Sequence, residues 1–192
     1  TRAIMQMGLE KTVITVLAPL LHKVRTMWQT NTINYAQENF IINLIRQKIF
    51  VSIDGQVSKP AEDAKTFCLF NSDREINDLG LLFYSYLLRK RGHKVIYLGV
   101  AQPYEDVTKL NVLGDIDIFI TSLNTKLVDE IISFAQSFNA AFPDKLIFIS
   151  GKMLHTLPSE LDTSQLPSNT IPISSPQQFI ESIESISESV AK

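Results

Sequence analysis

The sequence predicts an α/β protein in which a helical N-terminal region precedes a doubly wound parallel sheet. Apolar residues recur at helical spacing through the first part of the chain. After residue 57 the pattern changes, and short apolar runs alternate with amphipathic segments of helical length. This alternation is typical of parallel strands whose connecting helices cover both faces of the sheet. We therefore expect two domains, a helical cap over residues 1–57 and an α/β domain over residues 58–192.

The cap carries two apolar patterns with helical spacing. The first spans residues 8–28 and contains Pro19, which we expect to kink the helix or open it locally. Thr32 is a suitable N-cap for the second, which we expect to run to residue 53. Two helices cannot bury both of their faces, because a bundle normally needs three or four. The sequence therefore predicts a partial four-helix bundle, which either further helices or a partner surface would complete.

The second region contains five short apolar runs and four longer amphipathic segments. The expected strands are residues 67–70, 95–98, 116–120, 146–149 and 171–173. The expected helices are residues 75–91, 104–113, 126–138 and 176–190. Two capping boxes support these helix starts, Ser72 with Glu75 and Ser175 with Gln178. Buried strands and helices of these lengths predict a five-stranded, flavodoxin-like doubly wound sheet. Residues 54–65 would link the two domains.

Composition and charge exclude several classes of protein. The 192 residues are 45% hydrophobic and carry a net charge of −2, which argues against a nucleic-acid-binding surface. Cys68 is the single cysteine, so no intrachain disulfide forms, which fits a cytoplasmic protein. We expect Cys68 to be a small, buried apolar side chain. No uninterrupted apolar run is long enough to cross a bilayer, so we expect no membrane partner.

Familiar catalytic motifs are missing from the sequence. Ligands of doubly wound sheets bind beyond the carboxyl ends of the strands. The chain has no glycine-rich phosphate loop, no metal-binding set of Cys and His, and no nucleophile elbow. Its histidines are scattered at His22, His93 and His155, without a placed partner. We therefore expect a protein that is not an enzyme.

Several segments nevertheless match a known pattern. In the cap, Leu17-Ala18-Pro19-Leu20-Leu21 is followed by Trp28, nine further residues and then Glu38-Asn39. In the second domain the matching segments are Glu75-x-Asn77-x-x-Gly80, Val95-Ile96-Tyr97-Leu98-Gly99 with Pro103, and Ser122-Leu123. Together these segments resemble the cobalamin-binding sensor region of MerR-type transcription regulators, the light-dependent carotenoid-gene repressors among them. The resemblance covers nearly the whole chain.

The resemblance implies a cofactor and a mode of regulation. In that family a DNA-binding domain precedes the sensor region, adenosylcobalamin lies between cap and flavodoxin-like domain and drives tetramer formation, and light breaks the cobalt–carbon bond. By resemblance, Trp28 packs over the adenosyl group, Glu38 and Asn39 line its pocket, and Asn77 faces the cobalt. The same resemblance adds to the cofactor-binding residues Glu75, Gly80, Ser122 and Gly151.

The chain departs from the family pattern at four positions. Asn77 stands where the family has the histidine that ligates cobalt, and Asn39 replaces the histidine of the cap motif. Gln29 follows the tryptophan where the photoreceptors have a histidine, and Lys152 replaces the second glycine of a Gly-Gly pair. These changes predict cobalamin binding that is weakened, altered or lost, with no metal ligand from this chain. Trp28 is then compatible with core packing and Glu38 with a helix-end hydrogen bond. We favour this structural interpretation over ligand contact, because a tryptophan at helical spacing usually belongs to the core.

Two functions follow from these observations. The first is a sensor and oligomerisation domain of a MerR-family regulator, which contacts DNA only through an N-terminal domain absent from this chain. The second is a corrinoid-carrier subunit of a methyltransferase system, which depends more strongly on the missing histidine. A third, weaker hypothesis is a flavodoxin-like pocket that binds another small molecule. We expect a homo-oligomer that associates through residues 8–53 or residues 75–91.

Overall fold

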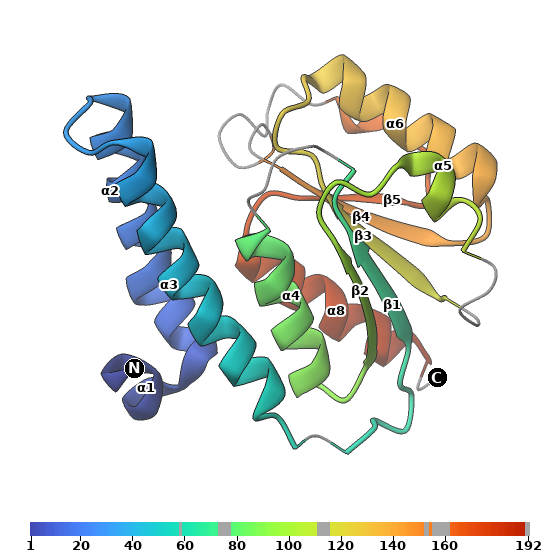
Figure 1. Ribbon diagram of the computed structural model, residues 1–192. Helices are drawn as coiled ribbons and strands as arrows, with labels where there is room; N and C mark the ends of the chain where they lie inside the picture. Colours follow the sequence, from blue (N-terminus) through green and yellow to red (C-terminus); the bar gives the residue numbers. More distant parts are fainter. Residues whose placement is uncertain (58, 73–77, 111–115, 152–153, 155–161, 191–192) are drawn as a thin grey trace. The chain divides into compact units, whose positions relative to one another are not determined.

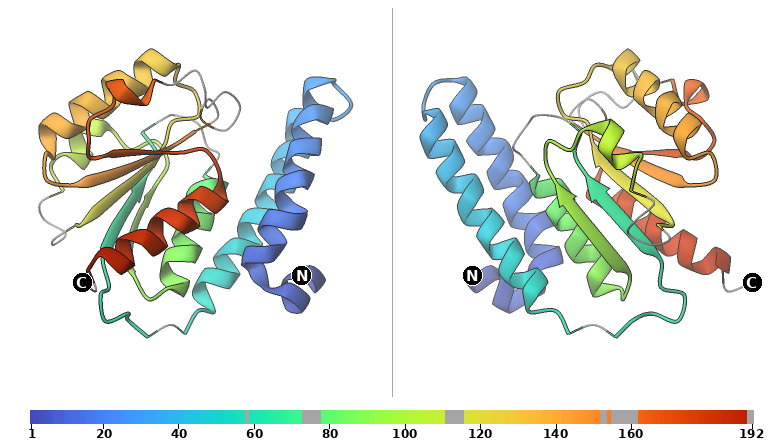
Figure 2. Two further views of the ribbon diagram at one scale, coloured as in Figure 1. Left: turned by 180° about the vertical axis from the view of Figure 1, so that it is seen from behind. Right: turned by 45° about the vertical axis from the view of Figure 1, so that its right-hand side comes forward.

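The computed structural model describes residues 1–57, 59–72, 78–110, 116–151, 154 and 162–190, without the side chains of 187–190. The chain divides into two compact units, Thr1–Val57 and Ser58–Lys192. The first is helical and the second is an α/β sandwich, as Figures 1 and 2 show.

The helical unit consists of helices connected by short breaks. It contains α1 (Arg2–Thr12), the π-helical turn η1 (Val13–Leu17), α2 (Ala18–Gln29) and α3 (Tyr35–Asp54). Helices α2 and α3 form an antiparallel hairpin (Figure 1). The wide turn η1 lies directly before Pro19, which has no N–H to donate to the preceding turn and whose ring crowds it. The expected local opening of the helix at Pro19 is therefore confirmed.

The start of α3 corrects one expectation. Its N-cap is Asn34 and not Thr32. The Asn34 side chain accepts a hydrogen bond from the Gln37 backbone N–H at 3.0 Å, and the Gln37 side chain accepts one from the Asn34 backbone N–H at 2.9 Å. This reciprocal pair satisfies two backbone donors, which a lone threonine cap cannot do. Thr32 instead lies in the hairpin turn, where its hydroxyl is 3.0 Å from that of Thr30.

The helical unit buries few of its apolar residues. Only Leu9, Val24, Ile45 and Ile49 are buried hydrophobics there. Large apolar side chains are exposed on all its helices, with Phe40 at 64% exposure. The segment Arg2–Gln29 is long and apolar enough to span a membrane by length and composition, a property that we did not expect. One such segment is weak evidence, because signal sequences and core helices of soluble proteins share it.

The second unit contains a five-stranded parallel sheet with strand order β2-β1-β3-β4-β5. The strands are β1 (Thr66–Phe70), β2 (Lys94–Gly99), β3 (Ile118–Ser122), β4 (Leu146–Ser150) and β5 (Thr170–Ile173). The connecting helices are α4 (Leu79–Lys90), α5 (Tyr104–Val107), α6 (Val128–Ala141) and α8 (Pro176–Val190), with the 3₁₀ turn η3 (Thr163–Gln165) before β5. This strand order is that of the flavodoxin-like doubly wound fold, so the predicted fold class is confirmed.

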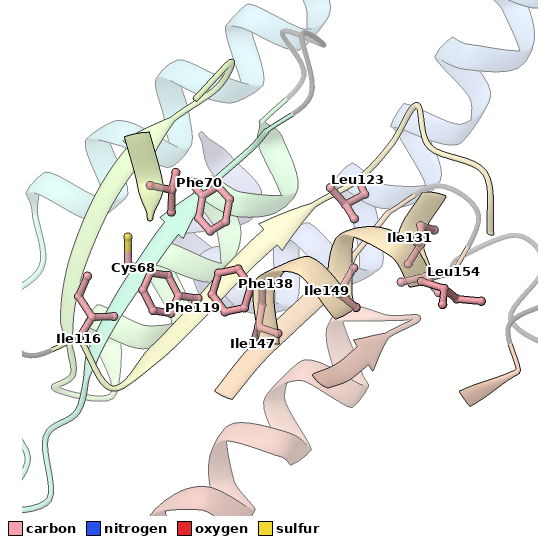
Figure 3. Close-up of a cluster of buried hydrophobic side chains, with 13 residues drawn as sticks. Cys68, Phe70, Ile116, Phe119, Leu123, Ile131, Phe138, Ile147, Ile149 and Leu154 are labelled. Atoms are coloured by element: carbon pink, nitrogen blue, oxygen red, sulfur yellow. The ribbon is translucent and has the colours of Figure 1, made fainter. Parts of the chain in front are cut away.

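Helices cover both faces of the sheet. Figure 1 shows α4 and α8 on one face and α5 and α6 on the other. Because strand side chains alternate in direction, Cys68 and Phe70 point toward α6, where they join the apolar cluster drawn in Figure 3. Phe119 contributes to this cluster from β3, with its ring 5.0 Å from that of Phe138 on α6. Burial raises the pKa of the Cys68 thiol to about 12, as expected for a small inert core residue.

Most elements of the α/β unit differ by one to three residues from the sequence-based bounds, and helices α4 and α5 differ more. Helix α4 begins at Leu79 rather than at residue 75, since Asp78 has non-helical backbone angles. The proposed capping box of Ser72 with Glu75 lies partly outside the described residues. Helix α5 is only four residues long, and β3 begins two residues later than expected, at Ile118. At the end of α5 the Thr108 hydroxyl donates to the Glu105 carbonyl, the kind of local bond that competes with helix propagation.

Helix α8 matches its prediction at both ends. The Gln178 backbone N–H donates to the Ser175 hydroxyl at 3.1 Å, as a capping box requires. The Gln178 side chain accepts bonds from the backbone and hydroxyl of Ser174 at 2.8 and 2.7 Å. The side chain thus reaches one residue further back than in the standard motif and ties the end of β5 to the helix.

Candidate functional site

The carboxyl ends of β1 and β3 define the candidate site. The two strands are neighbours in the sheet, although the chain passes through β2 between them. The chain leaves these strands in opposite directions, toward β2 on one side and β4 on the other. This is the topological switch point at which ligands of doubly wound folds bind. Polar residues gather here after the apolar strands, namely Asn71, Ser72, Thr121, Ser122 and Ser150.

Ser122 lies at the end of β3 and is paired in register with Ser150 at the end of β4. Both side chains are buried. The hydroxyl of Tyr84, from α4, lies 3.4 Å from that of Ser150. Burial raises the pKa of Tyr84 above its ordinary value, and the contact with Ser150 opposes this rise. Tyr84 therefore remains a neutral phenol that can donate or accept a hydrogen bond at this edge.

Two hydroxyl groups at the edge are buried without a partner. Within the part of the chain that the structure describes, the oxygens of Ser72 and Thr121 have no hydrogen-bond partner. Thr121 is completely buried. A buried hydroxyl without a partner costs roughly 1–3 kcal/mol, so such groups call for an explanation. At the switch point of this fold, a bound polar molecule would supply one.

The two glycines predicted to contact a cofactor lie in different surroundings. Gly80 is exposed in the first turn of α4, and a Cβ added there would meet nothing within 4 Å. A Cβ at Gly151 would lie 2.4 Å from the Leu123 carbonyl oxygen. Glycine at 151 is therefore required by packing against the loop after β3. Glycine within a helix costs about 1 kcal/mol relative to alanine, and no contact within the described part of the chain explains that cost at Gly80.

Asp78 and Tyr97 connect the first turn of α4 to the edge strand β2. The Tyr97 hydroxyl donates to the Asp78 carboxylate at 2.7 Å, and Asp78 is only 8% exposed. A hydrogen bond to a charged group of this length is among the stronger kinds in proteins. The contact fixes the residue directly before α4. We did not expect this pair, because residues 19 positions apart show no common pattern in the sequence.

The loop after β2 is held against the end of β1. The Asn71 backbone N–H donates to the Gly99 carbonyl at 2.9 Å, and the Gln102 backbone N–H donates to the Asn71 carbonyl at 3.0 Å. Ala101 has a φ of 55°, a left-handed conformation that is rare for residues other than glycine. Strain of this kind persists where the surroundings hold the backbone, and it occurs often at binding sites.

The other predicted site residues fall into two groups. Glu75 and Asn77 lie outside the described residues. Trp28, Glu38 and Asn39 belong to the helical unit. Trp28 is 42% exposed, and the expectation that it is a core residue stays a prediction. Glu38 lies in the first turn of α3, where a negative charge is favoured by the helix dipole.

No set of three or more His, Cys, Asp and Glu side chains in the described residues is arranged to hold a metal ion. Among those residues the carboxyl edge offers hydroxyls, amides and backbone groups from Asn71, Ser72, Thr121, Ser122 and Ser150. Such groups bind and orient a ligand through hydrogen bonds. They provide no nucleophile with an adjacent base.

Only the comparison with solved structures found similar proteins. No protein-family model and no curated protein matches the sequence. The structure is similar to that of the Methanosarcina barkeri monomethylamine corrinoid protein, with a TM-score of 0.74, 14% identity, and coverage of 96% of this chain and 88% of that one. It is also similar to a cobalamin-binding protein from Desulfitobacterium hafniense DCB-2, with a TM-score of 0.50, 12% identity and coverage of 92% and 82%. The chain shares its fold with these two proteins.

The residues of the carboxyl edge fit a corrinoid in two respects. Among the described residues, nothing would meet a side chain added at Gly80, at the start of α4. The hydroxyls of Ser72 and Thr121 lack partners within the described residues, and a ligand with amide side groups could satisfy them. One position departs from the pattern that the sequence resembles, because Asn77 stands where that pattern has the cobalt-ligating histidine.

Proposed function

We propose that the chain is a corrinoid-binding sensor module, the effector and oligomerisation domain of a MerR-type transcription regulator, and not itself an enzyme. The observation that carries the proposal is Gly80. It is a helical glycine that no contact among the described residues requires, at the ligand-binding edge of a fold shared with proteins named for corrinoid and cobalamin. The regulatory role rests on the sequence resemblance that Trp28, Glu38 and the segment around Asn77 carry.

In this proposal the α/β unit supplies most of the contacts. Gly80 allows close approach to the start of α4, and Ser122 offers a hydroxyl at the end of β3. Gly151 shapes the neighbouring turn. By the sequence resemblance, the further cofactor-binding residues are Glu75, Asn77, Trp28, Glu38 and Asn39. Cobalamin, when bound, supplies a cobalt–carbon bond that light can break.

Binding is tested by incubating the protein with adenosylcobalamin in the dark and separating free cofactor by gel filtration. We expect cobalamin absorbance to elute with the protein. The variant Gly80→Gln fills the open space with a side chain that helices tolerate, so we expect at least about a tenfold weaker Kd. Ser185→Gln adds the same side chain to an exposed position of α8 and serves as the matched control. Wild-type protein that elutes without cobalamin absorbance contradicts the proposal and leaves another small molecule as ligand.

The identity of the cobalt ligand gives a second test. Asparagine is a poor cobalt ligand compared with imidazole, so we expect the cofactor's own benzimidazole to stay on the metal. Uniformly ¹⁵N-labelled protein loaded with unlabelled cobalamin and reduced to Co(II) should show a three-line nitrogen splitting in its electron paramagnetic resonance spectrum. A two-line splitting, from a ¹⁵N ligand of the chain, would refute this assignment.

The same change of cobalt ligand predicts an oligomeric assembly that does not respond to light. Gln29 and Asn77 replace two histidines whose exchange on cobalt accompanies photolysis in the photoreceptors that this chain resembles. We therefore expect identical gel-filtration profiles for dark and illuminated samples with adenosylcobalamin. Profiles that differ between the two samples would contradict this expectation.

A corrinoid-carrier subunit is the alternative function. It is favoured by the likeness to a methylamine corrinoid protein that extends over 96% of this chain. Asn77 argues against it, because carrier chemistry depends on control of the lower cobalt ligand. A methyltransferase gene beside the coding sequence would support the carrier, whereas an upstream helix-turn-helix segment would support the regulator.

The proposal includes self-association. The exposed apolar side chains of the helical unit need a partner surface, and patches of this kind commonly mark interfaces. Helix α4 has eight buried residues among its twelve, so we favour residues 8–53 as the interface. We expect a homodimer by light scattering at concentrations of about tens of micromolar. A strictly monomeric mass would contradict it.

A further inference from the structure

The segment that leads from the helical unit into β1 is attached to the α/β unit. The Ala61 backbone N–H donates to the Gly92 carbonyl at 3.2 Å, and the Lys94 backbone N–H donates to the Lys65 carbonyl at 2.9 Å. Residues 59–65 therefore run along the turn between α4 and β2. We call this segment the clasp.

Gly92 makes the close contact of the clasp possible. Its φ is +84°, and its N–H and that of His93 bond back to the carbonyls of Arg89 and Leu88, as in a Schellman C-cap. A Cβ at Gly92 would lie 2.6 Å from the Ala61 nitrogen and 2.7 Å from the Lys59 oxygen. Any other residue would both strain this turn and push the clasp away.

His93 holds the clasp from the other side of the turn. It is 7% exposed, and its Nδ1 accepts a hydrogen bond from the Lys65 backbone N–H at 3.4 Å. Its ring lies 5.1 Å from the ring of Phe67. An Nδ1 that accepts a hydrogen bond carries no proton, so the imidazole in this arrangement is neutral.

The charges around His93 act in opposite directions. Burial lowers the pKa of His93, the nearby Asp63 carboxylate raises it, and the Arg91 guanidinium lowers it. Arg91 is also paired with Glu184 of α8 at 3.5 Å. Burial is the largest of these effects, so the folded protein favours neutral His93.

We infer that residues 59–65 are a pH-sensitive clasp, closed by Gly92 and neutral His93 and opened when His93 takes up a proton. A proton on Nδ1 removes the acceptor for Lys65 and places a charge beside Phe67. Because the folded pKa lies below the unfolded value, the clasp is fully stabilised above about pH 6.5 and weakens as pH falls below it. Opening releases the seven residues 59–65. When fully extended, they lengthen the linker after α3 by at most about 24 Å. The clasp would thus control how far the helical unit can move from the α/β unit.

Hydrogen exchange on the intact chain tests the clasp. We compare protection of the peptide covering residues 59–66 at about pH 7.5 and 5.5, corrected for intrinsic exchange rates, with that of β3 as reference. We expect at least about a tenfold loss of protection in the clasp at the lower pH and an unchanged β3. Equal clasp protection at both pH values would overturn the inference.

Three variants separate the histidine from the general effect of acid. His93→Gln keeps an acceptor but cannot be charged, so its clasp should stay protected at both pH values. Asp63→Asn removes the charge that favours protonation and should shift opening to lower pH. His22→Gln, at an exposed position of α2, is the matched control and should respond as wild type does. A pH response that survives in His93→Gln would refute the role of His93.

Discussion

The two units use similar apolar contents in opposite ways. In the α/β unit the three central strands β1, β3 and β4 are almost entirely buried. The side chains of Phe67, Phe70, Phe119, Phe138, Phe148 and Phe179 are almost completely enclosed. In the helical unit Phe40, Phe50 and Trp28 are exposed. A sheet with helices on both faces encloses its own core, whereas a helical hairpin has no second layer. The α/β unit is therefore stabilised by its own buried core, whereas the helical unit leaves an apolar surface that a partner can cover.

The sharpest test of this difference is a pair of phenylalanine truncations. Phe119→Ala should cost about 3–5 kcal/mol of unfolding free energy, because the ring is 2% exposed within an aromatic cluster. Phe40→Ala, at 64% exposure, should change it by no more than about 0.5 kcal/mol in dilute protein. Urea unfolding followed by circular dichroism measures both. A loss for Phe40→Ala that grows with protein concentration would instead assign this residue to a dimer interface.

Gly151→Ala comes next in expected size. The added Cβ would lie 2.4 Å from the Leu123 carbonyl oxygen, so the loop after β3 must move. We expect a loss of about 1–3 kcal/mol, measured by the same unfolding experiment. An unchanged unfolding free energy would show that the loop after β3 moves aside without cost, so this edge of the α/β unit would be no more tightly packed than the helical unit.

Trp28→Ala tests whether the cap is retained for packing or for a ligand. Because Trp28 is 42% exposed, we expect a loss of only about 1 kcal/mol without ligand, and not the larger loss of a core aromatic. If Trp28 contacts a corrinoid, the variant should also weaken cobalamin retention in gel filtration. A loss of 3 kcal/mol or more, roughly that of a buried aromatic, would restore the core interpretation.

Gly80→Ala should produce a small effect on stability, and of opposite sign. The position is helical and open, so alanine should stabilise the α/β unit by about 0.5–1 kcal/mol. Thermal unfolding without ligand measures the gain. Destabilisation would mean that the glycine serves the fold and would remove the observation on which the proposed function depends.

Local patterns in the sequence determined much of the α/β unit. Apolar runs separated by amphipathic segments predicted all five strands and the doubly wound sheet. Buried strands and amphipathic helices can be recognised from the spacing of apolar residues within a short stretch of sequence. The start of helix α8 was predicted because Ser175 and Gln178, which cap it, lie within four positions of each other. The opening of the first helix followed from Pro19 alone.

Contacts between distant residues decided the rest. The sequence does not reveal that Ala61 packs on Gly92, that Tyr97 bonds to Asp78, or that Leu123 closes over Gly151. Likewise, helical spacing predicted an apolar face on the cap but could not say whether Trp28 was covered. Periodicity specifies which face of an element is apolar, whereas only the tertiary structure brings a second element to that face or leaves it open to solvent.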